Sequence, residues 1–74
     1  MGGIVKSGVA AHDAACILAE GVRQAATAGS PTQATVDAAE IVYHRAVIAS
    51  CKANNGGNGA EASLRALQDL GQLS

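Results

Sequence analysis

Apolar residues recur at helical spacing in three stretches of the chain. The first, "VAAHDAACILAEGVRQAATA", carries a stripe spaced 4-3-4-3 along one face: Ala11, Ala15, Leu18, Val22 and Ala25. Such a repeat is typical of an amphipathic helix that packs along its apolar stripe. Ser7 in front of the stretch and Gly29 behind it suit the two ends of a helix. We therefore predict a helix over about residues 8–28.

The second stretch begins at the only proline of the chain. Ser30, Pro31 and Gln33 form the pattern of a capping box with proline at the first helical position. The pattern predicts a helix over about 31–53, whose main apolar face should lie against the first helix. That face comprises Val36, Ala39, Val42, Tyr43, Ala46, Ala49 and Ala53.

A run of Gly and Asn, "NNGGNG" at residues 54–59, favours a flexible connector after the second helix. Asn58 and Glu61 then repeat the spacing of a capping box. Gly71 suits the cap at the other end of a short helix. These signals predict a third helix over about 59–70.

Together these elements predict an all-α fold in a single small helical domain, residues 1–74. The first two helices would form an antiparallel helical hairpin, and the short third helix would complete a small helical bundle. Residues 1–7 would form an N-terminal arm. The β-branched residues follow helical spacing and do not alternate, so no strand is expected.

A second row of residues runs along the other side of the helix predicted over 31–53. It also has 4-3-4-3 spacing and comprises Asp37, Ile41, His44, Ile48 and Cys51. A helix with apolar residues on two sides is normally buried on two sides, and one short third helix offers little cover. We therefore predict that this row is an interface with a second copy or a larger assembly. The alternative is that the third helix folds back over the row, which would make the monomer self-sufficient.

The composition favours association. Seventeen of the 74 residues are Ala, and Tyr43 is the only aromatic residue, so few side chains remove much area from water when buried. A domain of this length buries only about 60% of the surface that its unfolded chain exposes. Small domains are usually stabilised by disulfides, a metal or association. Because the chain has only two cysteines, association is the route that the sequence favours.

His12 and Cys16 lie four residues apart on one predicted helix face and are the one Cys–His pair at that spacing. They suggest an alternative function, a small metal-binding or thiol-redox protein. His44 and Cys51 are seven residues apart, about 10 Å along a helix, which is too far for them to share an ion. Because no further ligand pair or glycine-flanked nucleophile accompanies them, we predict no enzymatic activity, no cofactor and no metal site. By default the cysteines are small apolar residues of the interior.

The charge and the hydropathy of the chain indicate which classes of partner and which cell compartment to expect. A net charge of −1 with 15% charged residues provides no basic patch for phosphates, so we expect no nucleic-acid partner. No apolar stretch approaches the ~18 residues of a membrane helix, so we expect no membrane partner. The first residues lack the apolar run of a signal peptide. We therefore expect a cytoplasmic protein, or a part of a particle that is assembled inside the cell.

These observations predict a non-enzymatic structural or assembly module. It would self-associate as a homo-oligomer or dock on a larger protein assembly through the second helix, as an accessory protein of a virion or of another complex. An adaptor that binds a helix in the groove between the first two helices is less favoured. That groove would be lined by Ala and not by the larger anchors that usually hold a peptide helix.

Overall fold

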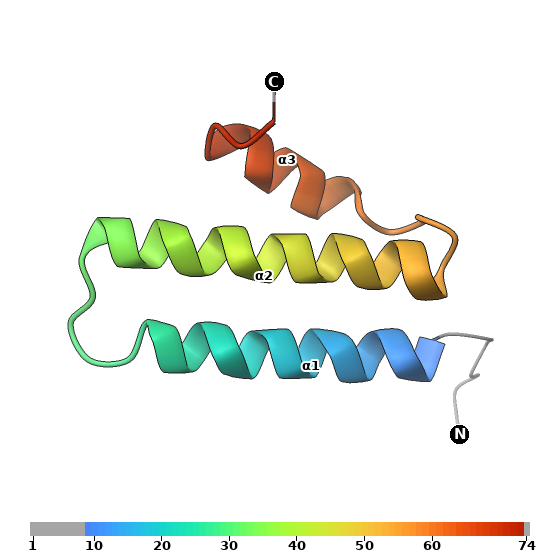
Figure 1. Cartoon of the computed structure of the whole chain (residues 1–74), viewed down its shortest axis with the longest axis horizontal. Helices are drawn as coiled ribbons and strands as arrows, with labels where there is room; N and C mark the ends of the chain where they lie inside the picture. Colours follow the sequence, from blue (N-terminus) through green and yellow to red (C-terminus); the bar gives the residue numbers. More distant parts are fainter. Residues whose placement is uncertain (1–8, 74) are drawn as a thin grey trace.

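A computed structural model describes residues 9–73 and confirms the all-α fold. The three helices are α1 (Val9–Ala26), α2 (Gln33–Asn54) and α3 (Glu61–Asp69). α1 and α2 run antiparallel side by side, and α3 crosses the side of α2 that faces away from α1 (Figure 1). Among these helices, α3 packs on α2 alone. The predicted N-terminal arm, 1–7, lies outside the described residues.

The start of α2 differs from the prediction by two residues. Thr32 is its N-cap, with extended backbone at φ −77° and ψ 163°. The Thr32 hydroxyl accepts a hydrogen bond from the backbone N–H of Thr35 at 3.2 Å. It therefore satisfies one of the free N–H groups of the first turn, which is the role that the prediction gave to Ser30. Pro31 lies just before the cap, and the helix begins at Gln33.

The end of α1 also comes earlier than predicted, at Ala26. Both the backbone N–H and the hydroxyl of Thr27 donate to the carbonyl oxygen of Arg23, at 3.0 Å and 2.9 Å. Gly29 then has a φ of +80°, in the left-handed region that favours glycine. The chain turns here and reaches α2 within a few residues.

Only one of the two predicted ends of α3 is correct. The N-cap is Ala60, which makes no side-chain capping bond, so the predicted role of Asn58 is wrong. At the other end Gly71 has a φ of +75°. The N–H of Gly71 donates to the carbonyl of Gln68 at 3.0 Å, and the next N–H donates to the carbonyl of Leu67 at 2.8 Å. This pair of bonds is a Schellman motif, which confirms the predicted C-terminal cap.

The buried interior is small and consists mostly of small side chains. Its apolar members are Ala19, Ala39, Cys51, Ala60 and Leu67. Leu67 is the only large aliphatic residue among them, with 2% of its surface exposed. Because α3 packs on α2 and not on α1 within residues 9–73, the burial of Leu67 belongs to the α2–α3 side of the molecule. None of the helices in residues 9–73 combines the length and the apolar content needed to cross a membrane.

Candidate functional site

The contact between α1 and α2 is a partly polar seam. Near one end His12 Nδ1 lies 2.7 Å from Ser50 Oγ, within hydrogen-bond distance. Ala19 and Ala39 are buried in the seam. Near the other end Arg23 of α1 reaches Glu40 of α2 at 3.1 Å. Polar pairs therefore join the two helices on both sides of a core of small residues.

Arg23 is the centre of the polar contacts in this seam. Its Nη1 donates to both carboxylate oxygens of Glu40, at 3.1 Å and 3.3 Å, and its Nη2 contacts Glu20. The guanidinium carbon also lies 3.8 Å from the centroid of the Tyr43 ring. Burial acts to lower the pKa of Arg23, but the hydrogen bond to Glu20 and the charge of Glu40 outweigh it, so the pKa is raised. The side chain therefore stays charged and holds α1 to α2.

The stripe predicted for the first helix lies only partly in this seam, because Ala15, Leu18 and Val22 line an open groove between the two helices. Leu18 and Val22 are 71% and 51% exposed, and Ala11 and Ala25 are also exposed. The face predicted for the second helix is likewise only partly buried, since its member Ala39 is buried while Val42 is 58% exposed. The physical reason is that the polar pairs must meet across the seam to be satisfied. Their pairing turns the larger aliphatic residues toward one side of the hairpin.

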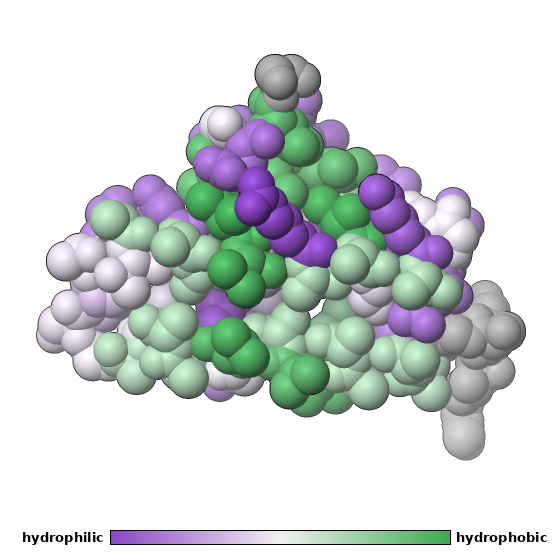
Figure 2. All heavy atoms as spheres, viewed as in Figure 1, coloured by the Kyte–Doolittle hydropathy of each residue, from purple (hydrophilic) through white to green (hydrophobic). Residues whose placement is uncertain are grey.

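The displaced aliphatic residues border an open apolar groove between α1 and α2. The groove has a volume of about 490 Å³. Its lining comprises Ala15, Leu18, Ala19, Val22, Arg23, Ala26, Thr35, Ala38, Ala39, Val42, Tyr43 and Ala46. Figure 2 shows this side of the molecule, where apolar residues gather over the middle of both helices. Among the described residues that line the groove, Arg23 is the only charged one, and it is paired with Glu20 and Glu40.

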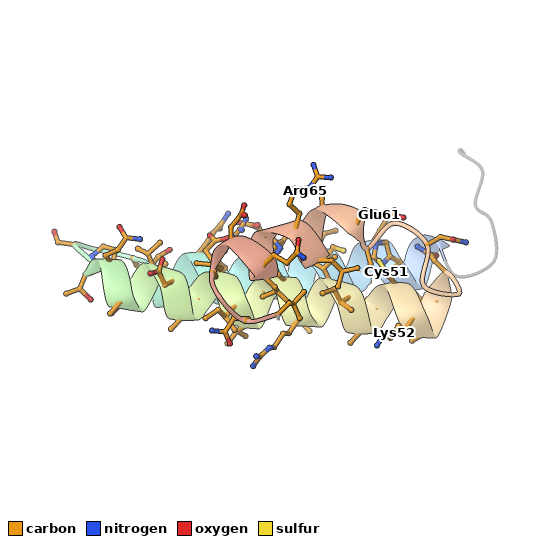
Figure 3. All side chains as sticks on the ribbon, turned by 90° about the horizontal axis from the view of Figure 1, so that it is seen from above. Cys51, Lys52, Glu61 and Arg65 are labelled. Atoms are coloured by element: carbon orange, nitrogen blue, oxygen red, sulfur yellow. The ribbon has the colours of Figure 1, made fainter. Side chains whose placement is uncertain are left out.

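α3 covers part of the row that was predicted as an interface. Cys51 has no exposed surface, and Ile41 and Ile48 are half-buried. Figure 3 shows Cys51 between α2 and the start of α3, while the neighbouring Lys52 projects away from α3. Asp37 is half-buried at the start of the row and accepts a hydrogen bond from Gln33 at 2.9 Å. The third helix thus packs against part of the row, at His44 and Cys51, and the role of the row as an interface stays a prediction.

His44, the remaining member of that row, belongs to a chain of polar contacts. Its Nδ1 lies 3.0 Å from Ser63 Oγ of α3, and its Nε2 lies 3.2 Å from Glu40 Oε1. Serine, histidine and glutamate in this order resemble a hydrolytic triad in type. Ser63 is buried, however, and Arg23 already binds Glu40. The arrangement therefore leaves a substrate no access to the serine and acts as a polar link between α2 and α3.

Several residues of these contacts were not singled out by the sequence. Arg23, Ser50 and Ser63 each pair with a residue of another helix. The spacing of Glu40 and His44 within one helix is visible in the sequence, but a partner from another helix leaves no such trace. No short-range signal would have found these three residues.

His12 and Cys16 are in contact, with 3.5 Å between Cys16 Sγ and His12 Nε2. Within residues 9–73 no group of three His, Cys, Asp or Glu side chains is placed to share a metal ion. Burial raises the pKa of the Cys16 thiol, and the charges of Cys51 and Asp13 raise it further. This direction is opposite to the lowered pKa that is typical of reactive cysteines.

No known protein family, curated protein or solved structure significantly matches this chain. Among the described residues, the most distinctive surface is the groove between α1 and α2 with its aliphatic borders.

The two thiols are expected to react slowly with iodoacetamide in the folded protein. At pH 7.5 Cys16 should react more slowly than a free thiol of ordinary pKa, and Cys51 should be protected, because it has no exposed surface. Raising the pH should speed the reaction of Cys16 as its thiol ionises. Mass spectrometry of the labelled protein, with the urea-unfolded chain as control, measures both rates. Labelling of Cys16 faster than a free thiol at pH 7.5 would instead support the thiol-redox alternative.

Proposed function

We propose that this protein is a non-enzymatic structural module that assembles with copies of itself. The observation that carries the proposal is the exposure of Leu18, Val22 and Val42 at 71%, 51% and 58% around one groove. Isolated exposed aliphatic residues are common on protein surfaces. Three that border a single apolar groove form a continuous patch, and such patches mark sites of association.

The small interior also supports self-association. Full burial of a Leu or Val side chain contributes about 1.5–3 kcal/mol, yet Leu67 is the only Leu, Ile or Val that the chain buries within residues 10–73. A second copy would cover the aliphatic residues at the groove of both protomers at once. Association would therefore supply the apolar burial that a single chain does not provide.

Covering the groove with a second copy would bury little unpaired charge. Of the residues that line it, only Arg23 is charged, and its guanidinium is already paired with Glu20 and Glu40. A buried charge is costly mainly when it lacks a partner. The groove side of the hairpin is thus better suited to the interface than the row of Ile41 and Ile48, which α3 partly covers.

Replacing Val22 with Lys should dissociate the assembly. Val22 is half exposed in the single chain, so the lysine is tolerated there, but a second copy would have to bury its charge. We expect the parent protein to sediment as an oligomer, and Val22→Lys to sediment as a monomer with unchanged helical circular dichroism. Analytical ultracentrifugation over a range of concentrations measures this.

The matched control is Ile17→Lys, on the same helix. Ile17 is also strongly exposed but does not line the groove, so this variant should keep the mass of the parent. A parent protein that remains monomeric at every concentration would refute self-association. Docking on a larger assembly would then be the remaining form of a structural role.

A further inference from the structure

We infer that the second copy docks with α1 of each protomer on α2 of the other, around a two-fold axis that runs along the helices. The result would be an antiparallel four-helix bundle in which α3 of each protomer lies on the outside. This inference rests on the proposed self-association and specifies its geometry. It follows from the shape of the groove, the level of its residues and the area of the face.

The two borders of the groove differ in the size of their side chains. At the middle of the groove the α1 border carries two aliphatic residues, Leu18 and Val22, whereas the α2 border carries one, Val42, which lies between Ala38 and Ala46 and next to Tyr43. In a two-fold interface each contact occurs twice, with the roles of the copies exchanged. When α1 packs on the partner's α2, the border with larger side chains faces the border with smaller ones. The two-fold axis repeats this contact on the other side of the interface.

The levels of these residues along the helices also fit. In two antiparallel helices, residues at the same height along the axis have residue numbers with a nearly constant sum. The contacts His12–Ser50 and Arg23–Glu40 give sums of 62 and 63. Because both helices rise by the same amount per residue, Val42 lies at a level between Leu18 and Val22. Rotation about an axis parallel to the helices does not change the height of a residue along them. The Val42 of the second copy would therefore fit between Leu18 and Val22 of the first.

The other face-to-face arrangement packs less well. With the two-fold axis across the helices, α1 would lie on the partner's α1 and α2 on the partner's α2. Leu18 and Val22 would then meet the same large residues, while Ala38 and Ala46 would meet alanines. One half of the interface would be crowded and the other half would contain a gap. Protein interiors are close-packed, so both the crowding and the gap are unfavourable.

The area of the face is sufficient for a second copy. α1 has 18 residues, so it is about 27 Å long, and two packed helices are roughly 20 Å wide. The flat footprint is then roughly 540 Å² for each protomer, or about 1,100 Å² for both. This clears the ~1,000 Å² minimum for a biological interface and comes close to the ~1,200–2,000 Å² of stable ones. A second copy is therefore a partner of the right size as well as the right shape.

Cysteine cross-linking tests the arrangement. Two variants, Val22→Cys and Val42→Cys, would be made in a Cys16→Ala background, given tags of different size, mixed in urea, refolded together and oxidised. Cys51 is retained, because it has no exposed surface. We expect the main covalent product to be the mixed dimer that joins the two variants, since α1 of one copy would lie on α2 of the other. The control mixes Ile17→Cys with Val42→Cys and should give at least tenfold less covalent dimer.

The possible outcomes separate the geometry from the function. Covalent dimers of Val22→Cys with itself and of Val42→Cys with itself, without the mixed dimer, would overturn this arrangement and leave self-association intact. An oligomer by sedimentation that yields no covalent dimer through the groove would also overturn it. A monomer by sedimentation would overturn both this inference and the proposed function.

Discussion

Replacing Leu67 with Ala is expected to lower the free energy of unfolding by about 2–5 kcal/mol, the range for a buried Leu truncated in a protein core. Leu67 is 2% exposed and is the only large aliphatic residue that is buried within residues 10–73. It lies on α3, which has nine residues and packs on α2 alone. A helix this short is not stable by itself, so the loss of its main anchor should also release it from α2.

Urea unfolding followed by circular dichroism, at one fixed protein concentration, measures the loss. Leu64→Ala is the matched control, because Leu64 lies on the same helix and is 42% exposed. It should cost less than about 1 kcal/mol, as expected for a side chain that is not part of the core. Labelling of Cys51 by iodoacetamide should also become faster in Leu67→Ala, since α3 covers this thiol. Equal destabilisation by the two variants would show that α3 does not dock through Leu67.

The second large effect is expected at Arg23. Arg23→Ala removes the bonds to Glu40 and Glu20 and the contact with the Tyr43 ring. It should lower the free energy of unfolding by about 2 kcal/mol, because hydrogen bonds to charged groups contribute about 1.5–3 kcal/mol when partly shielded from water. Arg23→Lys keeps the charge but loses the forked geometry, so it should recover only part of the loss.

Arg45→Ala is the matched control for Arg23. Arg45 is exposed and donates one hydrogen bond to Gln72 at 2.9 Å. Its removal should change the free energy of unfolding by less than about 0.5 kcal/mol. The same urea experiment measures all three variants. If Arg23→Ala were as mild as Arg45→Ala, the polar seam would not be what holds α1 against α2.

The helices and their order were predictable because they depend on local patterns. Apolar spacing identifies all three, and Gly71 ends α3 because glycine adopts the left-handed backbone of a Schellman motif readily. The start of α2 was predicted two residues early, since Ser30 and Thr32 are both good caps. Choosing between neighbouring caps depends on the path of the loop from α1, which a local pattern does not contain.

The positions of the candidate site were not predictable in the same way. The row of Ile41, Ile48 and Cys51 is present in the sequence, but in the structure Cys51 is fully buried and the two isoleucines are half-buried. The exposed apolar residues are instead Leu18, Val22 and Val42, which the pattern placed inside the hairpin. Contacts such as Arg23 with Glu40 join residues far apart in the chain, so spacing within one helix does not reveal them.

The sequence by itself determined the three helices, the hairpin with its short third helix, and the shortage of large apolar side chains. Only the tertiary structure decided which side of α1 and α2 faces inward. With alanine on most sides of both helices, the hydrophobic effect differs little between one rotation about the helix axis and another. The polar pairs across the seam, which must be satisfied when they leave water, select the rotation that places the larger aliphatic residues around an open groove.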